Sequence, residues 1–380
     1  MKVLVTNCTR NSGLSVMRAL SAAGWIVEGA DDRALAFGLR SRCASTAYAR
    51  LPHEDDPGFV AALLQLLEQT QPDVLIPTRG IEAACYARES VTARSHCLLA
   101  PPEAFEVLND KVRLLERCAA LSIARPQSFS PDEAERYLKA ASHYQVVIKP
   151  RRDVGGGHNV HIVSEATQIL PLYQRVVQAH GGALISEFIP GPTENLRAVQ
   201  LLFDSASRLI AYFVLRKLRI WPPGVGVTVA AVSTHETALV SSLVPLLKQL
   251  QWQGPVDAEF KIDSRDGLAK ILEINPRFSG AVHFPIACGV NMPMLYCRAA
   301  LGEHLAEAHQ PCYPAGMHYL DGGRWLAGLL SELRTPGSSR WAVLRRGWQE
   351  ELRGPRVRSV HTPSDPGPLL AKLFRSRGNA

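Results

Sequence analysis

Hydrophobic and polar positions alternate most clearly in the stretch 256–275. Two strand-like runs, 256–262 and 268–274, flank a polar turn that ends in Asp266-Gly267, so the pattern predicts an antiparallel hairpin. Successive side chains of a strand point to opposite faces. The even-numbered positions, with the exception of Lys270, are apolar and predict a core face: Val256, Ala258, Phe260, Ile262, Leu268, Leu272 and Ile274. The odd-numbered positions predict a face rich in oxygen atoms: Asp257, Glu259, Glu273 and Asn275.

The turn brings Glu259 opposite, or diagonal to, Glu273. Like charges that face each other across two strands are destabilising, and a bound cation is the simplest compensation. Carboxylate and amide oxygens are suitable ligands for Mg2+. The hairpin therefore predicts a magnesium site at Glu259, Glu273 and Asn275, with a solvated strand face of ordinary surface acids as the alternative. Arg277 adds a fixed positive charge just beyond this site.

The first hundred residues predict alternating strands and helices. In order, these are strand 2–6, helix 14–23, strand 25–30, helix 57–70, strand 73–77 and helix 81–90. Such an order is typical of a Rossmann-like sheet. The motif G-x-G-x-x-G is absent, so we expect no dinucleotide site. Thr78 and Arg79 follow a strand at the edge where open α/β sheets bind ligands, although an ordinary connecting loop explains them equally well.

The character of the chain changes after Pro101-Pro102. The pattern then predicts helices 112–121 and 132–141, strands 145–149, 160–163, 183–189, 196–203 and 209–216, and helices 166–179, 235–250 and 292–301. Lys149 precedes the run Gly155, Gly156 and Gly157, through which backbone amides can approach a polyphosphate closely. The basic, glycine- and proline-containing stretch 217–227 predicts a mobile lid.

Composition narrows the class of protein. With 380 residues the chain can form two or three domains, and its 46% hydrophobic and 20% charged residues are typical of a soluble globular protein. We expect a cytoplasmic protein without a membrane span, since no signal-peptide pattern or long apolar stretch is present. Eight cysteines without a C-x-x-C pair favour free thiols. Most of the net charge of +7 lies beyond residue 320, where a solvated basic face is the simpler interpretation, so no nucleic-acid partner is expected.

Taken together, the motifs resemble the ATP-grasp superfamily, in particular the synthetase domains of carbamoyl-phosphate synthetase and the carboxylate-amine ligases. The resemblance covers about residues 1–302. It rests on the sequence Glu273-Ile274-Asn275-Pro276-Arg277, on Lys149 before the glycine run, and on the segment 187–194.

The resemblance implies a mixed α/β and α+β fold. A Rossmann-like pre-ATP-grasp domain is expected at 1–105 and a two-lobed ATP-grasp domain at 106–302, with the glycine-loop lobe at about 122–187. A basic C-terminal extension follows at 303–380. In it, strand 316–320 and helices 324–333 and 341–352 are predicted, and the tail from about 354 is expected to be poorly ordered.

The resemblance also implies how ATP is bound. Lys111 and Lys149 resemble residues that contact the phosphates, and Gly155, Gly156 and Gly157 resemble the loop that covers them. Glu187 resembles the acid that accepts a hydrogen bond from the adenine amino group. Phe188 and Ile189 would hold the edge of the ring through backbone atoms, and Glu194 resembles the ribose-binding carboxylate.

Metal ligands and catalytic residues follow from the same comparison. Glu259, Glu273 and Asn275 match the ligands of the Mg2+ ions that bridge the phosphates, and Mn2+ is expected to substitute for Mg2+. Arg277 resembles the residue that holds the substrate carboxylate and its acyl phosphate, with a structural salt bridge as the alternative. Lys149 and Arg216 are expected to assist. Arg216 and Arg219 resemble substrate or phosphate contacts, although a solvated loop would explain both.

The implied activity is that of an ATP-dependent ligase. A carboxylate attacks the γ-phosphate of ATP to give an acyl phosphate and ADP, and an amine then displaces phosphate to form an amide or peptide bond. The alternatives are a carbamoyl-phosphate-type reaction, ligation to a thiol, and a regulatory protein that binds ATP without turnover. The expected partners are small-molecule carboxylate and amine substrates, and a homodimer is left open.

Overall fold

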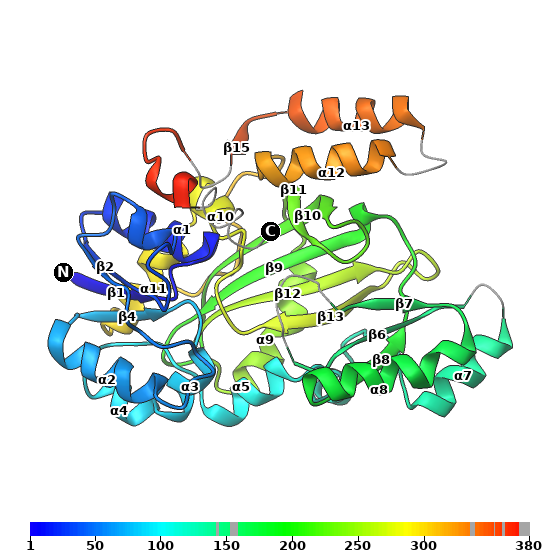
Figure 1. The fold of residues 1–380 in the computed structure, drawn as a ribbon, viewed down its shortest axis with the longest axis horizontal. Helices are drawn as coiled ribbons and strands as arrows, with labels where there is room; N and C mark the ends of the chain where they lie inside the picture. Colours follow the sequence, from blue (N-terminus) through cyan, green and yellow to red (C-terminus); the bar gives the residue numbers. More distant parts are fainter. Residues whose placement is uncertain (142–143, 153–158, 335–338, 353, 359–361, 372–380) are drawn as a thin grey trace.

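The computed structural model describes the chain except for residues 142–143, 153–158, 335–338, 353, 359–361 and 372–380. Three sheets organise the fold, and helices cover them (Figure 1). One sheet is parallel and belongs to the N-terminal region, whereas the other two are largely antiparallel. The predicted combination of α/β and α+β architecture is therefore confirmed.

The N-terminal sheet has four parallel strands in the order β3-β2-β1-β4. The strands are β1 (Lys2–Thr6), β2 (Ile26–Ala30), β3 (Thr46–Tyr48) and β4 (Val74–Pro77). The helices of this region are α1 (Asn11–Ala22), α2 (Phe59–Thr70), α3 (Ile81–Tyr86) and α4 (Arg88–Thr92). Parallel strands joined through helices have their carboxyl ends on one edge, which is where such sheets bind ligands. The Rossmann-like arrangement predicted for this region is present.

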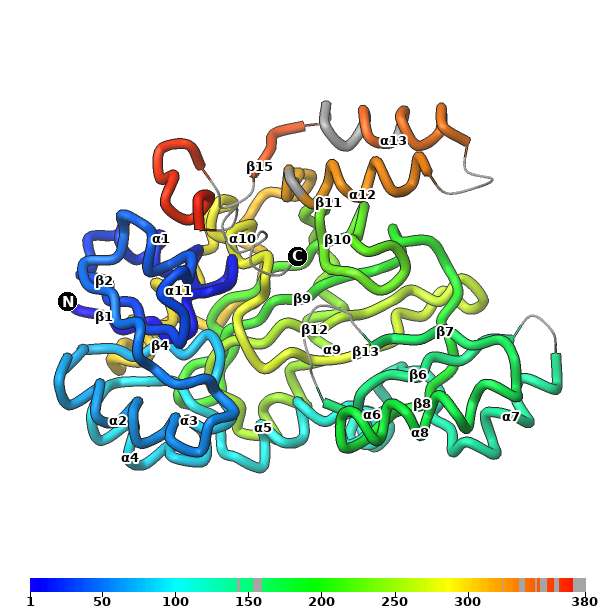
Figure 2. Tube along the Cα trace, viewed as in Figure 1, coloured from blue at the N-terminus to red at the C-terminus, as the bar shows by residue number. Residues whose placement is uncertain are grey.

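Two helices lead from this sheet to a small lobe with a core of its own. They are α5 (Pro102–Asn109), which the sequence pattern did not predict, and α6 (Lys111–Ala120), whose N-terminus is capped by Asp110. The small lobe contains β5 (Ser128–Phe129), α7 (Pro131–Ala140), β6 (Val146–Pro150), β7 (His161–Val163), α8 (Ile169–His180) and β8 (Ala183–Glu187). Its strand order is β5-β8-β6-β7, and its apolar side chains form a cluster separate from the main core. Figure 2 shows this lobe at the lower right of the molecule.

The central sheet has seven strands in the order β13-β12-β9-β10-β11-β14-β15. Their bounds are β9 (Leu196–Phe203), β10 (Leu209–Trp221), β11 (Val227–Thr234), β12 (Gly254–Ile262), β13 (Ala269–Asn275), β14 (His318–Leu320) and β15 (Arg356–Arg358). The helices that follow β11 and β13 are α9 (Thr237–Gln249), α10 (His283–Ala287) and α11 (Met292–Ala300). The C-terminal extension thus supplies two strands of this sheet.

The lid predicted at 217–227 is wrong over its first half. Strand β10 continues to Trp221, and the chain turns only between this residue and Val227. The cause is that two charged side chains of this stretch, Lys217 and Arg219, are buried and paired with Glu259 and Glu332. Charges paired in this way are compatible with a buried strand, although they read as a loop in the sequence.

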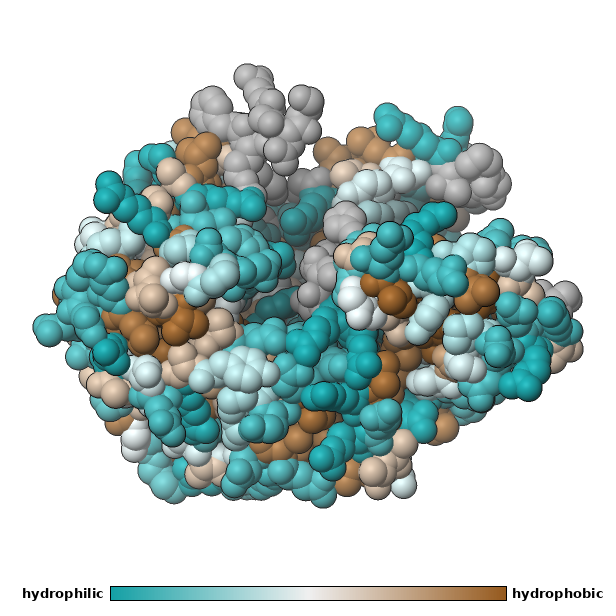
Figure 3. Space-filling view, turned by 60° about the horizontal axis from the view of Figure 1, so that its bottom comes forward, coloured by the Kyte–Doolittle hydropathy of each residue, from teal (hydrophilic) through white to brown (hydrophobic). Residues whose placement is uncertain are grey.

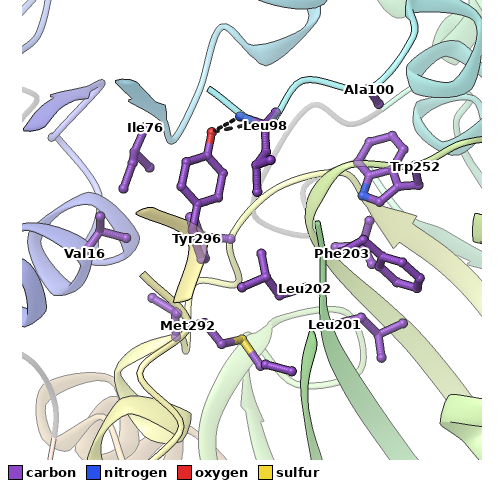
Figure 4. Close-up of a cluster of buried hydrophobic side chains, with 14 of the residues drawn as sticks. Val16, Ile76, Leu98, Ala100, Leu201, Leu202, Phe203, Trp252, Met292 and Tyr296 are labelled. Atoms are coloured by element: carbon purple, nitrogen blue, oxygen red, sulfur yellow. Dashed lines mark hydrogen bonds between the residues drawn. The ribbon is translucent and has the colours of Figure 1, made fainter. Parts of the chain in front are cut away.

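The N-terminal sheet and the central sheet share one apolar core. Tyr296 of α11 lies between them, almost fully buried (Figure 4). Its hydroxyl accepts a hydrogen bond from the Leu98 N–H at 2.9 Å and donates one to the Leu75 carbonyl at 3.2 Å. One side chain therefore ties a helix that follows β13 of the central sheet to backbone groups of the N-terminal region.

The extension forms a helical hairpin and a docked tail. Helices α12 (Gly322–Arg334) and α13 (Arg340–Leu352) lie side by side at the top of the view in Figure 1, with α12 against β10. Further along, Asp365 accepts hydrogen bonds from the Arg18 side chain at 2.7 Å, from the backbone of Arg42 at 3.2 Å and from Ser41. The segment 362–371 therefore contacts the N-terminal region, while the low order expected from about 354 stays a prediction.

Two further expectations concern the whole chain. All eight cysteines are free thiols, as predicted, and five of them are buried. Within the described residues, no helix combines the length and the hydropathy needed to cross a bilayer.

Candidate active site

A cleft of about 880 Å3 lies where the three sheets meet. The carboxyl ends of β1, β2 and β4 form one wall, the strands of the small lobe form another, and β10, β12 and β13 form the floor. In Figure 3 a hollow surrounded by hydrophilic residues lies between the left and right sides of the molecule. Most of the site residues predicted from the sequence line this cleft.

The hairpin of β12 and β13 places its acids as predicted. Glu259 pairs with Glu273 across the two strands, and Asp257 pairs with Asn275. All four side chains line the cleft. Side chains of directly opposite residues lie on the same face of a sheet, so the two glutamates face the same space.

A β-bulge corrects the predicted core face. After the pair of Glu259 with Glu273, Phe260 pairs with Ile271, so Leu272 is the extra residue of β13. Such a bulge reverses the alternation of side chains along its strand. Ile271 is consequently fully buried, Leu272 lines the cleft, and Leu268 is 54% exposed instead of lying in the core.

Three lysines from different elements surround the two glutamates. The Lys217 ammonium lies 2.8 Å from Glu259 Oε1, and the Lys111 ammonium lies 3.7 Å from Glu273 Oε2. Lys149 donates a hydrogen bond to the Leu272 carbonyl at 3.1 Å. Burial lowers the pKa of Lys149 to about 8, although the charge of Glu273 opposes this shift. The site thus holds positive charge where polyanionic phosphates could bind.

Lys217 was not predicted as a site residue, and Arg216 was. Arg216 is exposed and does not line the cleft, whereas Lys217 is 2% exposed and does. Adjacent strand residues point to opposite faces, so only one of the two can reach the cleft. The alternation of Lys217 and Arg219 with apolar neighbours was the sequence signal that could have revealed the continuing strand.

Arg277 and Asp257 complete the end of the site near β13. Arg277 Nη2 donates to Asn275 Oδ1 at 3.1 Å, and Asn275 Nδ2 donates to Glu273 Oε1 at 3.4 Å. Asp257 is buried, and its Oδ1 has no hydrogen-bond partner among the described residues. Burial raises the pKa of Asp257 to about 6, and the nearby charge of Glu259 adds to this effect. A cation or a proton at this point would relieve the repulsion between the acids.

The residues predicted to bind adenine lie on the wall of the small lobe. Glu187, Phe188 and Ile189 line the cleft. The Glu187 carboxylate is paired with Lys270 at 3.1 Å and with Arg265 at 3.3 Å. The backbone N–H of Phe188 donates to the Gln145 carbonyl, so other backbone atoms of 188–189 would have to hold a ring.

Two parts of the predicted nucleotide site, Glu194 and the glycine run, are not found among the described residues that line the cleft. Glu194 lies in a short 3-10 turn, and it is not among the residues that line the cleft. Its role in ribose binding stays a prediction. Gly155, Gly156 and Gly157 lie outside the described residues.

The donor atoms fit a magnesium ion that is shared with a ligand. Among the described residues, no three His, Cys, Asp or Glu side chains form a ready-made metal cluster. Mg2+ usually takes one or two carboxylates and completes its shell with water and phosphate oxygens. Glu259, Glu273 and the amide of Asn275 provide such a partial set, on one face of the hairpin.

Comparisons with known proteins agree with this geometry. Residues 206–321 match the family model described as "ATP-grasp in the biosynthetic pathway with Ter operon". The chain is 23% identical over 271 residues to the carbamoyl phosphate synthase large chain of Gemmatimonas aurantiaca, and the match covers 66% of this chain and 24% of that protein. It is 21% identical over 262 residues to the D-aspartate ligase of Enterococcus faecium, and the match covers 63% of this chain and 62% of the ligase.

A solved structure shows the same fold. The biotin carboxylase domain of the 2-oxoglutarate carboxylase of Hydrogenobacter thermophilus, a dimer in complex with MgADP, ADP and bicarbonate, superposes with a TM-score of 0.63. The identity is 20%, and the match covers 81% of this chain and 71% of that one. The chain spans about a quarter of one curated relative and about three fifths of the other. It shares the fold of the solved domain over most of its own length.

Proposed function

Since the chain has the ATP-grasp fold, we propose that it is an ADP-forming ligase that activates a carboxylate as an acyl phosphate and joins it to an amine. One observation carries this proposal. Glu259 and Glu273 face each other in a cleft that also holds Lys111, Lys149 and Lys217. The two acids can bind a metal ion and the three lysines can bind a polyphosphate. The site therefore suits a metal-bound polyphosphate better than a ligand that carries charge of only one sign.

In the proposed reaction the protein mainly positions its substrates and neutralises charge, as phosphoryl transfer requires. Lys149 and Lys111 would hold the phosphates of ATP, while 187–189 and Leu272 would border the adenine. Arg277 would hold the carboxylate in line with the γ-phosphate and stay charged as the acyl phosphate forms. Glu259, Glu273 and Asn275 would hold Mg2+, which would supply charge neutralisation for phosphoryl transfer, and we propose that Mn2+ can replace it.

The named relatives support ligation and leave the identity of the carboxylate to experiment. One relative is a D-aspartate ligase, and the solved biotin carboxylase domain contains bicarbonate. Both bicarbonate and amino-acid carboxylates are therefore candidates for activation.

We further propose a cytoplasmic enzyme. The solved biotin carboxylase domain is a dimer, and analytical ultracentrifugation would test whether this chain also associates into dimers.

Trapping of the activated carboxylate tests the function without knowledge of the amine. Purified protein is incubated with MgATP, hydroxylamine and a panel of carboxylic acids that includes bicarbonate. We expect ADP release that depends on one class of carboxylate, together with a hydroxamate wherever the acid is organic. A Glu273→Gln variant serves as the control for the metal-binding face. Binding of ATP with no carboxylate-dependent ADP release, across the whole panel, would instead favour a regulatory protein.

A further inference from the structure

Asp31 has a buried carboxylate with an unused oxygen at the N-terminal wall of the cleft. It directly follows β2, is fully buried, and lines the cleft. Its Oδ1 accepts hydrogen bonds from Thr9 Oγ1 at 2.8 Å and from the Arg33 N–H at 3.0 Å. Its Oδ2 has no hydrogen-bond partner among the described residues. A buried acceptor without a donor is costly, so a ligand that supplies a donor would be stabilised here.

The neighbouring acid makes a cation the best donor. Asp32 also lines the cleft, and its side chain is 23% exposed. Burial raises the pKa of Asp31 to about 6, and the adjacent Asp32 carboxyl group adds to the shift. Two carboxyl groups this close repel each other when both are ionised, and either a shared proton or a cation relieves the repulsion. The Arg33 guanidinium is paired with Asp32, with Nε 3.5 Å from Oδ2 of that residue. No donor among the described residues reaches Oδ2 of Asp31.

The same wall also carries positive side chains. Arg10 follows β1, and Arg79 follows β4, where it forms an ion pair with Glu54. The carboxyl ends of three parallel strands therefore present acids and guanidinium groups to one space. A ligand with one charge of each sign matches such a wall better than a ligand with a single charge.

From this arrangement we propose that the N-terminal wall binds an amino-acid substrate, with Asp31 and Asp32 holding its ammonium group. The inference rests on the proposed ligase function and names a substrate class for it. An ammonium group has three donors and no acceptor, so it can satisfy Oδ2 of Asp31 and the Asp32 carboxylate together. The nearby guanidinium groups would face the substrate's own carboxylate.

A sugar is the competing occupant. Acids at the end of the second strand of Rossmann sheets accept hydrogen bonds from ribose hydroxyls when a G-x-G-x-x-G loop holds a dinucleotide. This chain has no such loop. Hydroxyl groups would also leave the repulsion between Asp31 and Asp32 in place, whereas an ammonium group relieves it.

Binding can be measured on the full chain without nucleotide. Isothermal titration would use glycine, alanine, aspartate and lysine, the N-acetyl derivative of each, and ribose. We expect at least one free amino acid to bind and its N-acetyl derivative to bind at least about tenfold more weakly, since acetylation removes the charge. Asp31→Asn keeps the shape and removes the charge, so it should weaken binding by a similar factor. The matched control is Asp132→Asn, an exposed aspartate on α7 of the small lobe.

Each result of this experiment is decisive. Equal binding of free and acetylated compounds, binding of ribose alone, or binding unaffected by Asp31→Asn would overturn the proposal and would indicate a protonated Asp31 that only orders its loop. Absence of binding by every free amino acid up to about 10 mM would do the same. The affinity for MgATP, measured on the same proteins, should not change in Asp31→Asn. Failure of carboxylate-dependent ADP release would count against the ligase function and leave this binding result standing.

Discussion

The pair of Lys217 and Glu259 provides a quantitative test of how the cleft is built. Lys217→Met removes the ammonium group of a side chain that is 3% exposed, and this group lies 2.8 Å from Glu259 Oε1. At an effective dielectric constant of about 20, two unit charges at this distance attract by about 6 kcal/mol. Desolvation of the buried lysine offsets much of this attraction. Because Glu259 is also 26% exposed and partly screened, we expect a net coupling of about 1–3 kcal/mol.

A double-mutant cycle measures this coupling. Lys217→Met, Glu259→Gln and the double variant are unfolded by urea in the presence of EDTA, and their free energies of unfolding are compared with that of the wild type. ADP release is measured in parallel. Because Lys217 adds positive charge to the cleft in which the phosphates are proposed to bind, Lys217→Met should lower kcat by about 100-fold or more.

Arg216→Met is the matched comparison, since Arg216 is adjacent in sequence and exposed outside the cleft. The comparison of the two variants tests whether turnover depends on Arg216, which the sequence predicted, or on Lys217, which lines the cleft in the structure. We expect Arg216→Met to change kcat by less than about threefold. A coupling energy below about 0.5 kcal/mol, together with near wild-type turnover of Lys217→Met, would refute the assignment of Lys217 to the site.

Further predictions concern the metal face, the core and the docked tail. Glu273→Gln should lower ADP release by about 100-fold or more and shift the melting temperature little; unchanged turnover would contradict the metal assignment. Tyr296→Phe removes the hydroxyl that satisfies two buried backbone groups, so urea unfolding should show a loss of about 1–3 kcal/mol, and a loss near zero would contradict that role. Partial burial opposes ionisation of Asp365, but hydrogen bonds from Ser41 and Arg18 lower its pKa. The stabilisation that Asp365→Asn removes should therefore be complete at neutral pH and be lost progressively as the pH falls from about 4 through the lowered pKa of the folded state, so the difference in unfolding free energy between wild type and variant should be smaller at pH 3 than at pH 7.

Local patterns were sufficient for the elements and for the acidic face. The alternation between 256 and 275 predicted the hairpin and placed Glu259 opposite or diagonal to Glu273, because a period of two and a short turn fix which residues share a face, and the structure has the two directly opposite. The same alternation failed at Leu272. The position of a bulge depends on how a strand pairs with its neighbours, so the apolar pattern of a single sequence does not reveal it.

Tertiary structure alone decided which charged side chains share the cleft. Lys217 reads as part of a basic loop, yet it lies in a buried strand because an acid from another strand neutralises it. Asp31 reads as an ordinary strand end, and only the folding of the N-terminal region, which brings Thr9 of another loop against it, buries it beside the same cleft. The sequence determined strands, helices and the face of most hairpin residues because these depend on near neighbours. The electrostatic partners depend on long-range contacts, and burial strengthens those contacts by removing water from between the charges.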